Sequence, residues 1–128
     1  MQLDHATIVT KDIEAARRFF RAVVGLNEGP RPPFRIRGYW LYANVLPIIH
    51  LVDATVPAPE GKCAPRIDHI ALRIDSATEW LSLIERLRSN GIYYETVEVP
   101  LTGELQLFVT LAPGIVIEFV TALPCATH

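Results

Sequence analysis

Two short stretches of this sequence resemble each other and decide its architecture. The first, Leu3-Asp4-His5-Ala6, returns half a chain later as Ile67-Asp68-His69-Ile70-Ala71-Leu72. Each stretch is followed by a helical pattern and then by strand patterns that turns connect. Because such a repeat is one supersecondary unit used twice, the sequence predicts a single domain over residues 1–128. Its first module spans about 3–52, a linker about 53–65, and its second module about 66–121.

The order of the elements favours an α+β fold over a parallel α/β fold, because only two helices are expected and hairpin-forming strands follow each one. Asp12 is placed to cap the first helix and Gly25 to end it. Ser76 begins the second helix in a capping box with Glu79, and Gly91 ends it. Apolar residues at helical spacing form the expected buried face of the first helix: Ile13, Ala16, Phe20 and Val23.

The remaining apolar segments read as strands. The two expected hairpins pair 35–43 with 47–52 and 104–111 with 115–121. Another strand is expected at 93–99. The proline-rich residues 29–33 read as an irregular loop.

Bulk composition narrows the classes of function. The chain carries 12 basic and 14 acidic side chains, a net charge of -2, and 50% hydrophobic residues. Without a basic stripe, nucleic acid is not an expected partner, and no apolar run is long enough to cross a membrane. The N-terminus lacks the pattern of a secretory signal. Two cysteines, Cys63 and Cys125, are too few for a disulfide scaffold, so we expect free thiols and a cytoplasmic protein.

Four side chains suited to metal binding occupy equivalent points of the two modules. His5 and His69 lie in the opening strands, and His50 and Glu118 lie in the middle of the closing strands. Side chains alternate between the two faces of a strand, so these four can share one surface. Three imidazoles and one carboxylate are the composition of a site for one divalent ion, and they do not choose among Zn, Ni, Fe, Mn and Co.

Further residues are expected to wall this surface and to contact a small-molecule substrate. If both hairpin turns are three-residue loops, Trp40 lies opposite His50 and Phe108 lies opposite Glu118. The expected substrate-contacting residues are Trp40, Tyr42, Arg73, Gln106 and Phe108. The aromatic side chains serve equally well as core, and Arg73 equally well forms a salt bridge with Asp75 or Glu95. Three arginines among or near the prolines form either a solvated loop or a clamp for an acidic ligand: Arg31, Arg35 and Arg37.

At residues 3–121 the chain resembles the vicinal oxygen chelate superfamily, the glyoxalase/bleomycin-resistance/extradiol dioxygenase group. The resemblance rests on the following motifs: Leu3-Asp4-His5, Val24-Gly25-Leu26, Gly38-Tyr39-Trp40-Leu41-Tyr42, Asp68-His69-Ile70-Ala71, Gln106-Leu107-Phe108 and Ile117-Glu118-Phe119. It implies two βαβββ modules that form a half-open, mixed β-sheet cleft around one metal ion. The family's ligand positions map to His5, His50, His69 and Glu118. A histidine at position 50 departs from the glutamate or glutamine common in glyoxalase I and methylmalonyl-CoA epimerase.

We expect a divalent-metal-dependent lyase or isomerase of the glyoxalase type, with an extradiol-type Fe(II) dioxygenase as the alternative, and His50 decides between these activities. If His50 binds the metal, four ligands leave two open positions for one bidentate substrate, and a glyoxalase-type lyase or isomerase is favoured. Glu118, detaching from the metal, would then move the proton. If His50 is free, it becomes a candidate base, and three ligands suit an extradiol-type Fe(II) dioxygenase. A third hypothesis is a non-catalytic binder of the bleomycin-resistance kind. We expect a homodimer, with the modules pairing either within a chain or between chains.

Overall fold

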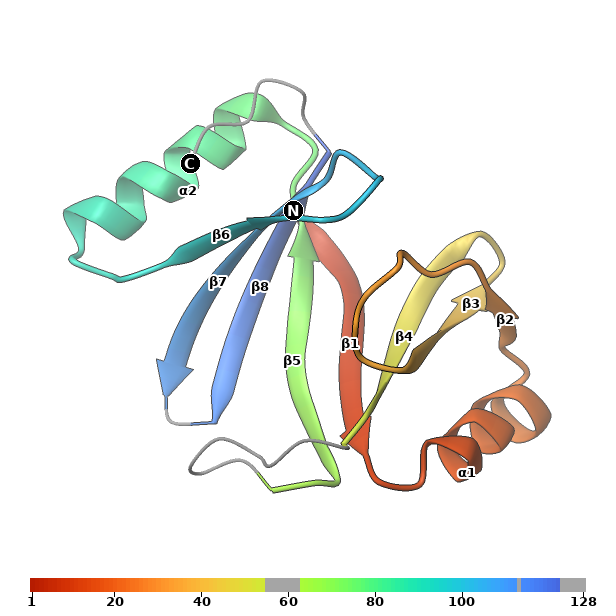
Figure 1. Ribbon diagram of the computed structural model, residues 1–128. Helices are drawn as coiled ribbons and strands as arrows, with labels where there is room; N and C mark the ends of the chain where they lie inside the picture. The colour runs from red at the N-terminus through yellow and green to blue at the C-terminus, as the bar shows by residue number, and fades with distance from the viewer. Residues whose placement is uncertain (55–62, 113, 123–128) are drawn as a thin grey trace.

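The computed structural model describes residues 1–54, 63–112 and 114–122, which form one open β-sheet flanked by helices (Figure 1). The strands are β1 (Gln2–Thr10), β2 (Asn27–Gly29), β3 (Gly38–Ala43), β4 (Leu46–Asp53), β5 (Arg66–Arg73), β6 (Glu95–Glu98), β7 (Leu105–Ala112) and β8 (Ile115–Thr121). The helices are α1 (Ile13–Arg18), the π-helix η1 (Phe19–Val24) and α2 (Ala77–Ser89). This content confirms the predicted α+β class.

The sheet is mixed, and its strand order shows the repeat directly. The eight strands run β2-β3-β4-β1-β5-β8-β7-β6. β1 pairs in parallel with β4, β5 pairs in parallel with β8, and β1 and β5 pair antiparallel at the centre. The two modules therefore meet through their opening strands, side by side in Figure 1. β2 and β6 lie at opposite ends and do not pair with each other, so the sheet stays open.

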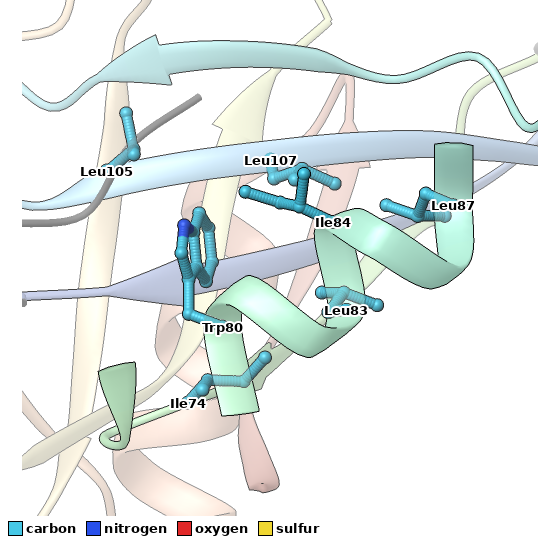
Figure 2. Packing of buried hydrophobic residues seen from close by; sticks show 7 residues of the cluster. All are labelled: Ile74, Trp80, Leu83, Ile84, Leu87, Leu105 and Leu107. Carbon is cyan, nitrogen blue, oxygen red and sulfur yellow. The ribbon is translucent and has the colours of Figure 1, made fainter. Parts of the chain in front are cut away.

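The second module builds its core from α2 packed against β7 (Figure 2). Ser76 caps the helix as predicted, because its hydroxyl accepts from the amide of Glu79 at 3.3 Å. The prediction that the Glu79 side chain bonds back to Ser76 is wrong, because the Glu79 carboxylate contacts the amino group of Met1 at 3.3 Å instead. Gly91 follows the helix with φ 66°, the left-handed conformation expected at its end. Trp80 fills the centre of the cluster and is fully buried.

The first module's helix departs from the sequence prediction after its first turns. Asp12 caps α1 by accepting from the amide of Ala15 at 3.1 Å, and Gly25 ends the helical segment with φ 88°. Between them the chain becomes π-helical at Phe19–Val24. A π-helix has a wider turn than an α-helix, so the α-helical spacing no longer identifies the buried face. Val23, expected inside, is 73% exposed, whereas Ile13 is buried as predicted.

Several strand boundaries also differ. Asn27–Gly29 forms the edge strand β2, partly in the stretch expected to be a loop, and pairs with β3. Residues 35–37 and 93–94 lie outside strands. β4 runs through Asp53, the first residue of the expected linker, and linker residues 55–62 lie outside the described ranges. Cys63 is free and exposed, and Cys125 is outside the described part of the chain.

The two cross-strand pairs predicted for the site are confirmed, although the turns differ from those assumed. Trp40 pairs with His50, and Phe108 pairs with Glu118. In the first hairpin Ala43 pairs directly with Leu46, so its turn is shorter than three residues. A register shift next to Leu41 restores the predicted pairing, because a bulge adds one residue to one strand. The second hairpin carries a similar shift before Ala112.

Within the described ranges, no helix combines the length and the apolar character needed to cross a lipid bilayer.

Replacing Trp80 with alanine should strongly destabilise the second module. The side chain is fully buried among α2 and β7 residues, and loss of a buried tryptophan typically costs about 3–5 kcal/mol. Denaturant unfolding of Trp80→Ala should show this loss. Leu81→Ala is the matched control, because Leu81 lies next to Trp80 on the same helix but is 51% exposed, so its replacement should change stability by less than about 0.5 kcal/mol. Equal losses in both variants would contradict the packing described.

Candidate metal centre

Three of the four predicted ligands come together at the middle of the sheet. One ligand atom from each of His5, His69 and Glu118 lies within 4.8 Å of the others. The register explains the meeting: Ala71 of β5 pairs with His5 of β1 on one side and with Glu118 of β8 on the other. Ala71 is small and fully buried, so it leaves the space on this face of the sheet to the larger side chains of His5 and Glu118.

Glu118 is a buried carboxylate with one oxygen unsatisfied. Its residue is 1% exposed. Oε1 accepts a hydrogen bond from Gln106 Nε2 at 2.7 Å, whereas the buried Oε2 accepts none. Burial raises the pKa of Glu118, against the opposing effect of the two nearby imidazoles of His5 and His69. Leaving a buried acceptor without a partner is costly, so Oε2 is suited to a cation.

Each imidazole is oriented by the aspartate that precedes it. His5 Nδ1 lies 2.6 Å from Asp4 Oδ2, and His69 Nδ1 lies 2.9 Å from Asp68 Oδ2. A carboxylate accepts hydrogen bonds, so each Nδ1 donates, and in a neutral imidazole the lone pair is then on Nε2. His5 Nε2 then faces Glu118 Oε2 at 3.2 Å. His69 Nε2 is 3.0 Å from the Thr7 hydroxyl, which donates to it.

Arginines hold the two aspartates in turn. Arg73 donates to Asp4 Oδ1 at 2.6 Å and to Glu104 Oε2 at 2.6 Å, and Arg66 donates to Asp68 Oδ1 at 2.8 Å. The alternative prediction that Arg73 pairs with Asp75 or Glu95 is therefore wrong. Burial by itself would raise the pKa of Asp4, but its hydrogen bonds with His5 and Arg73 outweigh burial and lower that pKa to about 2. Asp4 is thus an anion at neutral pH.

His50 lies against the group but outside it. Its ring stacks on His5 with the centroids 3.6 Å apart and on Trp40 with the centroids 4.1 Å apart. Its Nε2 donates to the carbonyl oxygen of Pro47 at 3.1 Å. Burial, aided by His5, lowers the pKa of His50 to about 2, so the ring is neutral. In this arrangement its engaged nitrogen does not face His69 and Glu118.

The group opens into a cavity of about 470 Å³. Of the five residues expected to contact substrate, Trp40, Arg73, Gln106 and Phe108 line this cavity. Tyr42 does not belong to the lining; its ring packs over Gly29 and its hydroxyl donates to the carbonyl of Pro30 at 2.5 Å. The loop between β2 and β3 forms a further part of the wall, with Arg31, Phe34, Arg35 and Ile36.

Sequence reasoning missed the supporting residues of this centre. Asp4 and Asp68 stand at the same place in both repeats, so the Asp-His pair was itself a signal for oriented imidazoles. Thr7 and Ala71 also carried a signal, because each follows a ligand by two residues and so shares its face. The roles of Glu104 and Arg66 depend on contacts that no local pattern indicates.

The fold is an open sheet built from two βαβββ modules, and a His-His-Glu group lies where the modules meet. These features define the class of proteins in which two such modules form a cleft around a central site. The chain belongs to the Glyoxalase/Bleomycin resistance protein/Dioxygenase superfamily, whose family model matches residues 2–119. No curated protein matches the chain in sequence.

Solved structures with the same fold include enzymes of three kinds. The Mn(II)-bound glyoxalase from Novosphingobium aromaticivorans is 20% identical, with a TM-score of 0.71, and the match covers 94% of this chain and 38% of that one. 2,2',3-Trihydroxybiphenyl 1,2-dioxygenase from Sphingomonas wittichii strain RW1 is 15% identical, with a TM-score of 0.72, and the match covers 93% of this chain and 41% of that one. Methylmalonyl-CoA epimerase from Mycobacterium tuberculosis is 23% identical, with a TM-score of 0.67, and the match covers 96% of this chain and 89% of that one. This chain thus spans less than half of the first two proteins and most of the third. At these identities the likeness establishes the fold.

Replacing Asp4 with asparagine should weaken metal binding while preserving the shape of the side chain. The amide no longer supplies the anion that orients His5 and pairs with Arg73. Loss of such an outer partner typically costs about 10–100-fold in metal affinity. Calorimetric titration of Zn²⁺ into the metal-free protein measures the change. Asp75→Asn, an exposed carboxylate next to α2, is the control and should bind as the wild type does; an unchanged affinity in Asp4→Asn would refute the orienting role.

Proposed function

We propose that the protein is a divalent-metal enzyme in which His5, His69 and Glu118 hold the ion and the cavity above them holds a substrate with two vicinal oxygens. The observation that carries this proposal is the convergence of two oriented imidazoles and one buried carboxylate within 4.8 Å. The donor set fits a divalent ion, because the carboxylate oxygen that would bind it lacks any hydrogen bond. When bound, the ion would supply Lewis acidity toward the chelated oxygens.

Among the reactions of this superfamily, the three-residue group favours an extradiol-type Fe(II) dioxygenase. Two histidines and one carboxylate are the facial triad of non-haem iron oxygenases, which leaves room for a bidentate catechol and for dioxygen. His50, the residue whose role separates the candidate reactions, donates its Nε2 to Pro47 in the structure. The aromatic side chains of Phe34, Trp40 and Phe108 in the cavity wall suit a planar ring.

The chain's own residues have defined tasks in this proposal. Asp4 and Asp68 keep the imidazole Nδ1 protons in place, so that both Nε2 lone pairs point forward; the lone pair of His69, which accepts from the Thr7 hydroxyl here, would exchange that hydrogen bond for the ion. Gln106 fixes Glu118 through Oε1. His50 presents a neutral ring beside His5 and serves to position the substrate. Its lowered pKa makes it a poor general base.

A glyoxalase-type lyase or isomerase is the second candidate, and the state of Glu118 favours it. Reactions of this type move a proton between adjacent carbons, which requires a group whose pKa lies nearer to neutrality than that of an ordinary carboxyl. In the protein without a metal ion, burial raises the pKa of Glu118 in this direction, and Glu118 faces the same cavity. A metal-free binding protein accounts less well for the structure, because it has no need of an unsatisfied buried carboxylate beside two oriented imidazoles.

One experiment tests both the metal and the reaction. Protein purified without an immobilised-metal column is analysed for metal by mass spectrometry, beside a His5→Ala/Glu118→Ala variant and an Asp75→Ala control. We expect near-stoichiometric metal uptake in the wild type and control, and loss in the double variant. Protein reconstituted with Fe(II) is then mixed with catechols in an oxygen electrode, and Ni²⁺- or Mn²⁺-protein with methylglyoxal and glutathione.

The outcomes separate the hypotheses. Oxygen consumption with formation of a ring-cleaved product supports the dioxygenase. Conversion of the 2-oxoaldehyde adduct without oxygen uptake supports the lyase or isomerase and overturns the dioxygenase. A wild type that stays empty after incubation with these metals refutes the metalloenzyme and leaves metal-independent ligand binding as the better account.

We also propose that the protein acts in the cytoplasm as a homodimer. An exposed free thiol at Cys63 suits a reducing compartment. Apolar side chains of the two central strands remain exposed in a single chain, with Leu3 at 65%, Ile67 at 67% and Ile70 at 38%. A second copy of the chain would remove this surface from water. Sedimentation velocity should give twice the chain mass of 14.3 kDa; a monomer at micromolar concentration refutes the dimer.

A further inference from the structure

Arg31 is a half-buried guanidinium in the cavity wall without a counter-ion. Its Nε is sealed from solvent and has no hydrogen-bond partner. One terminal nitrogen donates to the carbonyl oxygen of Ile36 at 2.9 Å, and the guanidinium carbon lies 5.0 Å from the centre of the Phe34 ring. Neither contact supplies negative charge. Burial alone lowers the pKa of Arg31, with no carboxylate opposing the effect.

The acidic side chains that line the cavity all have cationic or imidazole partners, whereas two of its arginines have no acidic partner in the described ranges. Asp4 and Glu104 are both held by Arg73. Glu118 belongs to the central group with His5 and His69. Arg31 and Arg35, which line the same cavity, have no carboxylate within ion-pair distance in the described ranges. With a divalent ion in the central group, the cavity therefore carries surplus positive charge, and part of it lies on the loop between β2 and β3.

A continuous set of rings runs from the loop between β2 and β3 to the central group. Phe34, beside Arg31, lies 6.3 Å from Trp40, which stacks on His50 at 4.1 Å, and His50 stacks on His5 at 3.6 Å, all between ring centroids. Arg31 and the central group thus lie at the two ends of this row of rings. An apolar or aromatic body can lie along this wall while its two ends meet different polar groups.

We propose that the substrate carries a carboxylate at the end remote from its vicinal oxygens, and that Arg31, assisted by the more exposed Arg35, binds this carboxylate. The inference rests on the proposed function for the position of the chelating end. Arginine suits the task, because its planar fork matches a carboxylate and its charge strengthens each hydrogen bond. The terminal nitrogen of Arg31 that makes no hydrogen bond within the described part of the chain is available to donate.

Binding to the Zn²⁺-loaded protein tests the proposal without turnover. Calorimetry compares 3,4-dihydroxyphenylacetate with 4-methylcatechol, which has the same chelating end and no carboxylate. We expect the wild type to prefer the carboxylated ligand by about tenfold or more. Arg31→Gln should lose this preference and keep its affinity for 4-methylcatechol. Arg31→Lys should keep part of it, and Arg86→Gln, which removes an exposed positive charge on α2, should keep all of it.

Equal affinity for the two catechols in the wild type overturns the inference, even if the metal and the reaction stand as proposed. A preference that survives in Arg31→Gln also overturns it, and assigns Arg31 a purely structural role in its loop. If Arg31→Gln does not fold, Arg31→Lys and the wild-type preference decide. Tighter binding of 3,4-dihydroxybenzylphosphonate than of the carboxylate would overturn the assignment of a carboxylate.

If neither catechol binds, the proposed chelation has failed and the anion site is judged separately. The metal-free protein is then titrated with phenylacetate and with its neutral analogue phenylacetamide, so that no metal can take up the carboxylate. Tighter binding of phenylacetate that Arg31→Gln abolishes supports the anion site by itself. Equal binding, or binding of neither, overturns it.

Discussion

The antiparallel pairing of β1 with β5 is the constraint on which the rest of the molecule depends. It is the only direct sheet pairing between the modules in the described residues, and it places Ala71 between His5 and Glu118. A slip of one residue would turn every side chain of one strand to the opposite face. The central group would then disperse, although each module could keep its own helix and core. The site is thus a property of the interface between the repeats, and neither module contains it alone.

Charge at this interface is arranged in layers. The imidazoles and Glu118 form the centre, Asp4 and Asp68 lie behind the imidazoles, and Arg73 and Arg66 lie behind the aspartates. Such layers fix the direction of each imidazole, because each Nδ1 and each oxygen of the two aspartates has a partner. The unsatisfied atom remains at the front, on Glu118. Stability and function diverge here, since the buried carboxylate is costly to the fold in the absence of a cation.

The sequence was sufficient for the architecture, because repeat, helix caps and strand alternation are local signals. It also brought His5, His69 and Glu118 to one surface, since two of them share the same motif and the third occupies a strand centre. The orientation of His50 could not be predicted from the sequence, because its hydrogen bond to Pro47 and its stacking between two rings depend on tertiary packing. The same holds for Tyr42, drawn away by the edge strand β2, and for Arg73, whose partners are distant in the chain. The exposure of Val23 was not predicted for a different reason, since a π-helix has a wider turn than the α-helix on whose spacing the prediction rested.

The placement of the two tryptophans gives the molecule two separate intrinsic reporters. Trp80 is enclosed in the α2 core and reaches no solvent or ligand while the fold persists. Trp40 faces the cavity and stacks on His50, which in turn stacks on His5. Its emission therefore responds to whatever alters that stack, and the emission of Trp80 responds to loss of the core. Fluorescence from a single unlabelled chain thus distinguishes occupation of the cleft from unfolding, because the two events act on different indoles.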